Sequence, residues 1–158
     1  MLDRTDRKLL ECLQRDATLS IAELAELVGL STTPCWKRVK RLEDEGYILR
    51  RVALVDRAKI GLKVTIFVSI RTNEHDPEWL ENFARVAALF PEIVELYRMS
   101  GDVDYLMKVV TQDVEGYDRF YKKLIKAVRL TDVSSAFAME QIKYSTELPL
   151  EDPSTGSG

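Results

Sequence analysis

The sequence predicts an α+β fold, with an N-terminal helix-turn-helix domain followed by a C-terminal βαββαβ domain. In the first part of the chain, apolar residues recur at helical spacing and are interrupted by a glycine turn at Gly29. From Val64 onward, stretches with a period of two alternate with helical stretches. Strand-helix-strand-strand-helix-strand is the ferredoxin-like order, in which both helices cover one face of an antiparallel sheet.

The first two helices are predicted from their caps and apolar stripes. Asp3 is placed to cap a helix that ends near Asp16, with Asp6 as its capping-box partner. Ile21–Val28 has apolar residues at i, i+3, i+4 and i+7, which is one buried stripe. Gly29 follows directly, where a left-handed residue ends a helix without a Cβ clash.

A third helix begins after Ser31, which occupies the N-cap position, and carries Pro34 in its first turn. Cys35, Val39 and Leu42 share one face and should pack inward. The basic run on the other face would by itself fit a solvated helix, but the turn, the cap and the preceding helix favour a DNA-reading helix. Threonines near the N-terminus would meet base edges, and basic residues would neutralise phosphates. The candidate DNA contacts are Ser31, Thr32, Thr33, Trp36, Lys37, Arg38, Lys40 and Arg41.

Charge is unevenly distributed along the chain. The net charge of −3 argues against a nucleic-acid partner, but residues 1–62 carry +2 and the remainder carries −5. Local field rather than total charge attracts a polyanion. Double-stranded DNA therefore remains the expected partner.

Composition excludes several other classes. With 46% apolar and 31% charged residues, the chain is typical of a globular domain, and it has no membrane-length apolar run or signal peptide, so a cytoplasmic location is expected. Cys12 and Cys35 are expected to be buried free thiols, and the lone His75 gives no zinc spacing. No metal and no cofactor are expected.

The remaining elements follow from changes in periodicity. Ile48–Val55 is predicted as a strand or short ribbon and Asp56–Leu62 as a connector. Strands are expected over Val64–Ile70, Ile93–Met99, Tyr105–Val110 and Val133–Lys143, and helices over Pro77–Phe90 and after the cap Asp113. The expected organisation is a helix-turn-helix domain at 1–50, a strand or linker at 51–62, the βαββαβ domain at 63–145 and a disordered tail at 146–158.

A βαββαβ domain leaves one sheet face uncovered. An apolar uncovered face usually marks an association surface, so a homodimer formed by sheet-to-sheet packing is expected. Depending on the pairing register of the strands, the candidate residues for this face are Tyr97, Met99, Val133, Phe137 and Met139.

Four segments resemble the Lrp/AsnC (feast/famine) family of transcriptional regulators: Leu2–Leu10, Leu24–Ser31, Val39–Gly46 and Gly101–Leu106. Within the family, Thr32–Arg38 and Phe137–Tyr144 are most similar to the cysteine-responsive branch. The resemblance covers nearly the whole ordered chain. It implies a winged-helix-like DNA-binding domain and an ACT/RAM-type domain that binds effectors and oligomerises, with dimers that assemble further, often to octamers.

The resemblance also implies an amino-acid effector, bound between dimers, that alters oligomeric state or DNA binding. On spacing alone, the turn at 100–104 is a polar hairpin. Under the resemblance, Asp102 or Asp104 would accept the ammonium group, and Gly101 would let the ligand approach a backbone amide. The full candidate set is Ser100, Gly101, Asp102, Asp104, Thr131, Asp132 and Ser134. The loop Val128–Val133 departs from the family by being shorter and lacking glycine, which leaves the effector open; cysteine or another small sulfur amino acid is the expectation.

The leading hypothesis is therefore an amino-acid-responsive, sequence-specific DNA-binding regulator and not an enzyme. One alternative is an architectural DNA-binding protein that needs no effector. A less favoured alternative is an amino-acid-sensing regulatory subunit of an enzyme. Asp102 and Asp104 have no activated partner nearby, and no residues remain for a catalytic domain.

Overall fold

The computed structural model describes residues 1–72 and 76–150, and the described chain divides into two compact units. One unit contains Met1–Leu54 together with the segment that begins at Lys143, and the other contains Val55–Ile142. His75, expected in a polar loop, lies outside the described residues. Among the described helices, none is long and apolar enough to cross a membrane.

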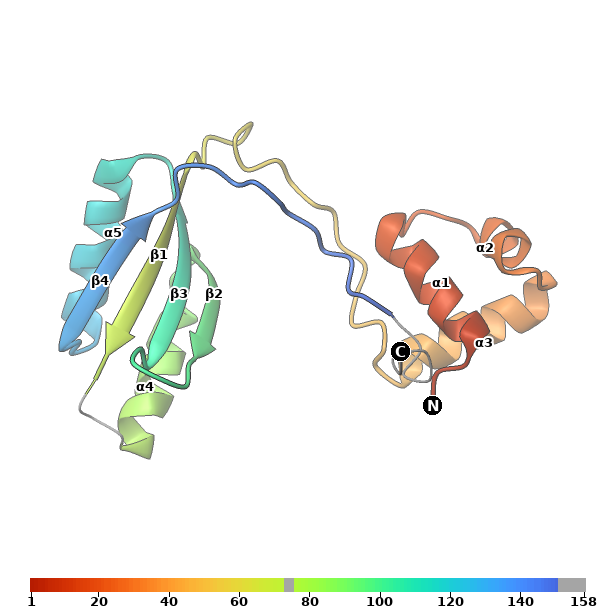
Figure 1. The fold of residues 1–158 in the computed structure, drawn as a ribbon, viewed down its shortest axis with the longest axis horizontal. Helices are drawn as coiled ribbons and strands as arrows, with labels where there is room; N and C mark the ends of the chain where they lie inside the picture. Colours follow the sequence, from red (N-terminus) through yellow and green to blue (C-terminus); the bar gives the residue numbers. More distant parts are fainter. Residues whose placement is uncertain (73–75, 151–158) are drawn as a thin grey trace, which may run out of the picture. The chain divides into compact units, whose positions relative to one another are not determined.

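The N-terminal unit contains three helices, α1 (Arg4–Arg15), α2 (Ile21–Val28) and α3 (Thr32–Asp44) (Figure 1). The predicted capping box at the start of α1 is present, with Asp3 and Asp6 each accepting from the other's backbone amide. The inward residues of the three helices form one core, which includes the fully buried Leu9, Leu24, Cys35 and Leu42.

The two cysteines are free thiols in different surroundings. Cys35 is completely buried in this core, and burial raises the pKa of its thiol. Cys12 is only half-buried. The Cys35 thiol therefore acts as a small apolar core group, whereas the expectation of full burial does not hold for Cys12.

The turn between α2 and α3 depends on Gly29. Its φ of 70° is left-handed, and its amide and that of Leu30 both bond back to the last turn of α2. Ser31 has the expected N-cap geometry but makes no side-chain capping bond. Pro34 at the third helical position removes one of the two amides that the Ser31 hydroxyl could accept from, and the other, that of Thr33, is not used.

Two expectations for the segments that join the units are corrected. Ile48–Val55 is not a strand, because no neighbouring strand bonds to it and most of its side chains are exposed. The tail was expected to be disordered from 146, yet Gln14 and Leu148 exchange hydrogen bonds of 3.1 and 2.6 Å between the Gln14 side chain and the Leu148 backbone. Arg15 also pairs with Glu147 at 3.1 Å. The first residues of this tail are thus attached to α1.

The second unit has the predicted βαββαβ order. Its elements are β1 (Val64–Arg71), α4 (Pro77–Ala87), β2 (Ile93–Arg98), β3 (Tyr105–Thr111), α5 (Val114–Ala127) and β4 (Asp132–Phe137). The sheet is antiparallel in the order β2-β3-β1-β4, and both helices lie on one face (Figure 1). The core between sheet and helices includes Ile66, Val68, Phe83, Met107 and Phe120.

The last strand is shorter than predicted, ending at Phe137 rather than Lys143. Its partner β1 begins at Val64, so the chain beyond Ala138, whose amide still bonds to Thr65, has no strand left to pair with. The pairing register also corrects which residues were predicted to lie on the uncovered face of the sheet. Val133 and Phe137 pair with Ile70 and Ile66 and so lie on the helix-covered face.

The uncovered face carries apolar residues at other positions. Tyr97 pairs with Leu106, on the opposite side from the buried Leu96–Met107 pair, and Phe67 lies on the same side as Leu106. Phe67 and Tyr97 are 40% and 52% exposed. The expectation for Tyr97 is therefore confirmed, and Phe67 replaces the two β4 residues as an apolar group on this face.

Replacing Gly29 by alanine should lower the free energy of unfolding by about 1 kcal/mol, because a left-handed conformation is costly for a residue with a Cβ. No atom lies within 4 Å of the position a Cβ would occupy, so the cost comes from the backbone and not from a clash. Urea denaturation at neutral pH measures it. Gly29→Asn is the matched control and should lose less; equal stability of the Ala and Asn variants would contradict this account.

Candidate DNA interface and effector site

The N-terminal half of α3 presents unpaired polar groups to solvent. Thr32, Thr33 and Lys37 are exposed, and Trp36 is 53% exposed. Within the described chain, Lys37 makes no ion pair, and the Ser31 hydroxyl is not used as a cap. This end of a helix also concentrates free amides and the positive end of the dipole, both of which favour an anionic partner.

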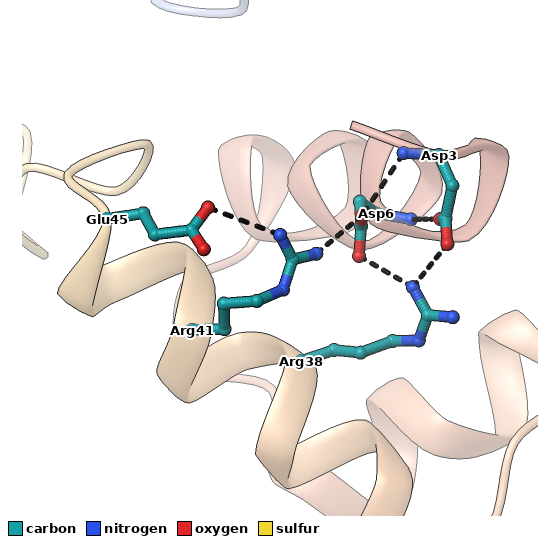
Figure 2. Close-up of polar contacts among 5 residues, drawn as sticks. All are labelled: Asp3, Asp6, Arg38, Arg41 and Glu45. Carbon is teal, nitrogen blue, oxygen red and sulfur yellow. Dashed lines mark hydrogen bonds and ion pairs between the residues drawn. The ribbon is translucent and has the colours of Figure 1, made fainter. Parts of the chain in front are cut away.

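The two arginines of α3 lie in a different environment (Figure 2). Arg38 donates through Nη1 to Asp3 Oδ2 at 2.6 Å and to Asp6 Oδ1 at 2.8 Å. Arg41 donates through Nη2 to Asp6 Oδ2 at 2.6 Å and through Nη1 to Glu45 at 3.2 Å. Both guanidinium groups are therefore already paired with carboxylates, three of the four contacts being short and charge-assisted.

Asp6 is the centre of this network. Its side chain is 1% exposed, and its two oxygens serve one arginine each while Oδ2 also accepts the Asp3 amide. Burial alone would raise the pKa of Asp6, but the hydrogen bonds from Arg41, the Asp3 amide and Arg38 outweigh it and hold that pKa below its ordinary value. Asp6 is thus a buried charge that is stabilised only while both arginines are in place.

The remaining basic residue of the candidate set, Lys40, pairs with Asp44 at 2.7 Å one turn along the helix. Both side chains are more than half exposed, so this pair contributes little and releases the lysine readily. The structure therefore divides the predicted DNA contacts into two groups. Ser31, Thr32, Thr33, Trp36, Lys37 and Lys40 are accessible, whereas Arg38 and Arg41 join α3 to α1.

A polar hollow of about 200 Å³ lies on the uncovered face of the sheet. It rests on two neighbouring cross-strand pairs, Ser69 with Ser134 and Arg71 with Asp132, and Val103 borders it. Every second residue of a strand points to the same face of the sheet, and residues paired across adjacent strands share a face. These four polar side chains therefore lie together on the uncovered face. We call it the outer-face hollow.

Arg71 connects the two loops that were predicted to hold an effector. Its Nε donates to the Asp102 carbonyl at 2.8 Å, and its Nη1 lies 3.5 Å from Asp132 Oδ2. Both partners in this ion pair are more than half exposed, so the pair is weak and open to exchange for a ligand. The outer-face hollow therefore offers a guanidinium, a carboxylate and two hydroxyls to a small polar molecule.

The predicted effector residues do not all lie at this hollow. Asp132 and Ser134 line it, and Asp102 contributes its backbone carbonyl to Arg71. The Asp104 carboxylate accepts the Thr72 amide at 2.7 Å and so helps to fix the turn. Ser100, Gly101 and Thr131 are exposed and do not line the hollow; Gly101 has a φ of 111° and shapes the turn.

Sequence reasoning missed Ser69, Arg71 and Val103. Ser69 and Arg71 fall on the outward-facing positions of the period-two pattern in β1, and that pattern was the available signal. Which outward residues meet β4 depends on the pairing register, which the pattern alone does not contain. Among the described residues, no group of three or more His, Cys, Asp or Glu side chains is placed to hold a metal ion.

The exposed face of α3 and the outer-face hollow are typical of one class of protein, a regulator with a DNA-binding domain and a ligand-binding domain. Residues 2–48 match the model of winged helix-turn-helix DNA-binding domains, and residues 65–148 match that of the Lrp/AsnC ligand binding domain. The chain belongs to the Lrp/AsnC family of transcriptional regulators.

Relatives and solved structures agree over nearly the full length. The chain is 55% identical to the DNA-binding transcriptional activator DecR of Escherichia coli, over 96% of this chain and 100% of DecR. An AsnC family transcriptional regulator from Agrobacterium tumefaciens is 61% identical, with a TM-score of 0.92 and coverage of 94% and 97%. A transcriptional regulator from Neisseria meningitidis in complex with L-Met is 32% identical, with a TM-score of 0.90 and coverage of 95% and 97%.

Replacing Asp6 by asparagine should lower the free energy of unfolding by about 3 kcal/mol at neutral pH, because it removes one partner from a buried ion pair. Urea denaturation measures this, with Asp44→Asn as the control. Asp44 pairs with Lys40 at the surface, where water screens the charges, so its loss should leave the stability nearly unchanged.

The native chain and the Asp6→Asn variant should differ in how their free energies of unfolding depend on pH. Because the pKa of Asp6 is lowered in the folded chain, its contribution is complete above the unfolded carboxyl pKa, near about 4, and is lost as pH falls through the folded value. The stability gap between the native chain and Asp6→Asn should therefore narrow below about pH 4. If the difference in the free energy of unfolding between the native chain and Asp6→Asn stays constant from pH 7 to pH 3, the negative charge of Asp6 is not what stabilises the contact between α1 and α3.

Proposed function

We propose that this regulator reads specific DNA sequences with the N-terminal half of α3 and responds to an amino acid bound at the outer-face hollow. The observation that supports the first part most strongly is the division of charge on α3. Thr32, Thr33 and Trp36 are free to meet base edges, Lys37 and Lys40 are free or easily freed to meet phosphates, and the two arginines are held by α1.

Support for the second part comes from the chemistry of the outer-face hollow. An amino acid carries one carboxylate and one ammonium, and Arg71 and Asp132 are the complementary charges. Ser69 and Ser134 add two hydroxyls between them. A regulator of related sequence and fold has been solved with L-Met, an amino acid with a sulfur-containing side chain. We propose a small sulfur amino acid, with cysteine as the first candidate, since residues 32–38 and 137–144 resemble the cysteine-responsive branch.

We further propose that the uncovered sheet face packs against a second copy of the chain. Phe67, Tyr97 and Met99 are between 40% and 52% exposed on or beside this face. Burial of such apolar groups favours association. A symmetric dimer would place two α3 helices on successive half-sites, and further assembly, up to the octamer expected from the resemblance, would engage more of them.

Lys37→Ala should reduce the slope of log affinity against log salt by about 1, because one phosphate contact is lost. Its melting temperature should be unchanged, since Lys37 has no ion pair within the described chain. Binding to a DNA fragment selected from a random pool, measured by fluorescence anisotropy across salt concentrations, tests this. Lys126→Ala on α5 is the control and should leave the slope unaltered. An unchanged slope for Lys37→Ala, with a reduced slope for Lys126→Ala, would reject the proposed interface.

Among the twenty amino acids, at least one should raise the melting temperature of the full chain. A free ligand concentration one hundred times the dissociation constant should raise the free energy of unfolding by about 2.7 kcal/mol. Arg71→Ala should abolish that stabilisation, whereas Ser100→Ala, outside the hollow, should retain it. If no amino acid stabilises the native chain at millimolar concentration, the result contradicts the proposed effector site and favours the alternative of an architectural DNA-binding protein that needs no effector.

A further inference from the structure

Trp36 is a large apolar side chain on the exposed, otherwise polar side of α3. It is 53% exposed, although tryptophan carries one of the largest apolar surfaces of any residue. It lies one turn after Thr32 and one turn before Lys40, and so outside the buried face of Cys35 and Val39. Tryptophan is enriched at binding interfaces, where burial of its ring contributes much of the affinity. Its exposure here therefore points to a contact that α3 makes with a partner.

The two tryptophans of the chain differ in their surroundings. Trp79 is half-buried, its ring stacks on Phe83, and its indole N–H donates to the Arg129 carbonyl at 3.3 Å. Trp36 has neither a ring contact nor a hydrogen bond in the part of the chain that the structure describes. The indole N–H usually finds an acceptor when a tryptophan becomes buried. Trp36 thus brings both an apolar ring and a free donor to any surface that covers it.

The major-groove edges of the bases differ in ways that an indole ring can distinguish. An indole has an apolar surface and one N–H donor, but it has no acceptor. Thymine presents a methyl group beside the O4 acceptor, whereas cytosine and adenine present amino donors. Guanine presents acceptors but has no methyl group. Thymine is therefore the base whose edge matches both properties of the Trp36 side chain.

The position of Trp36 along α3 suits a contact with a base. In a helix-turn-helix, residues near the N-terminus of the second helix meet base edges. Trp36 lies about one turn from the start of α3, whereas Arg38 and Arg41, which α1 holds, follow it. The adjacent Lys37 is exposed and has no ion pair within the described ranges, so it is available to a phosphate beside that base.

We propose that Trp36 determines a preference of this regulator for thymine, by packing its ring against a thymine methyl group in the major groove. This inference rests on the proposed use of α3 as the DNA-reading helix. Burial of one methyl group corresponds to about a fourfold change in affinity. In a dimer that occupies two half-sites, the two contacts together correspond to about fifteenfold.

The preference is tested with two forms of one DNA duplex and the full chain. The first form is selected from a random pool for binding to the native chain, and the second has deoxyuridine in place of each thymine, which removes only the methyl groups. Fluorescence anisotropy measures both dissociation constants. The native chain should bind the deoxyuridine duplex about fourfold or more weakly, and for Trp36→Ala the ratio of the two constants should fall to about 1.

Lys37→Ala is the matched control on the same face of α3. It should weaken binding to both duplexes by the same factor and so keep the native ratio, because a phosphate contact does not depend on the base. Trp36→Phe retains an apolar ring and should keep a ratio well above 1. Melting temperatures close to that of the native chain would show that both Trp36 variants are folded, as expected for a side chain outside the core.

Three results would overturn the proposal. The first is a native ratio of about 1, and the second is a ratio that Trp36→Ala leaves unchanged. The third is a ratio that Thr33→Ser abolishes and Trp36→Ala does not, which would assign the methyl contact to the threonine methyl group. If neither Trp36→Ala nor Lys37→Ala alters binding to either duplex, α3 is not the reading helix, and the proposed function fails together with this inference.

Discussion

A carboxylate buried at the start of α1 fixes how α3 is presented, and the function of the N-terminal unit depends on it. Leu9, Leu24 and Leu42 hold the helices together, but apolar packing has little directional preference. The hydrogen bonds from Arg38 and Arg41 to Asp6 are short and directional, and each arginine donates to a different oxygen of the Asp6 carboxylate. Together with the burial of Cys35, Val39 and Leu42 on one face of α3, they orient the helix so that its other face is exposed.

This arrangement exchanges DNA affinity for orientation. The charges of Arg38 and Arg41 are offset by the carboxylates that hold them, which lowers the attraction of these two arginines for phosphates. Phosphate contacts contribute affinity without sequence information, whereas the correct placement of a few side chains at base edges contributes specificity. A recognition helix with fewer free cations and a fixed orientation is therefore suited to selecting among sequences more than to binding DNA tightly. The near-neutral charge of the N-terminal unit agrees with this balance.

Periodicity and capping were sufficient to predict the five helices and four strands found in the described residues, in their order along the chain, whereas the strand expected at Ile48–Val55 was wrong. The capping box of Asp3 and Asp6 and the left-handed Gly29 are local features, and local features can be recognised in a sequence. Pairing between distant positions could not be predicted. A shift of one residue in register exchanges the faces of a strand, which is why Val133 and Phe137 were assigned to the wrong side. The Asp6–Arg41 pair, 35 residues apart, depends likewise on how two helices dock.

The outer-face hollow lies on the strand that precedes the C-terminal tail. Asp132 and Ser134 belong to β4, and β4 continues directly into the segment that bonds to α1. Leu148 exchanges two hydrogen bonds with Gln14, close to the end of α1, and Asp6 at its other end holds the arginines of α3. The chain therefore leads from β4 into a segment that is bonded to α1, and α1 is bonded in turn to α3. A physical route of this kind becomes a regulatory one only where the ligand favours one of two arrangements of that segment. The tail is attached to the N-terminal unit by the bonds of Gln14 and Arg15 and by Leu150, which packs against the core of the three helices, so a ligand that released the tail would have to overcome this apolar contact as well as the hydrogen bonds.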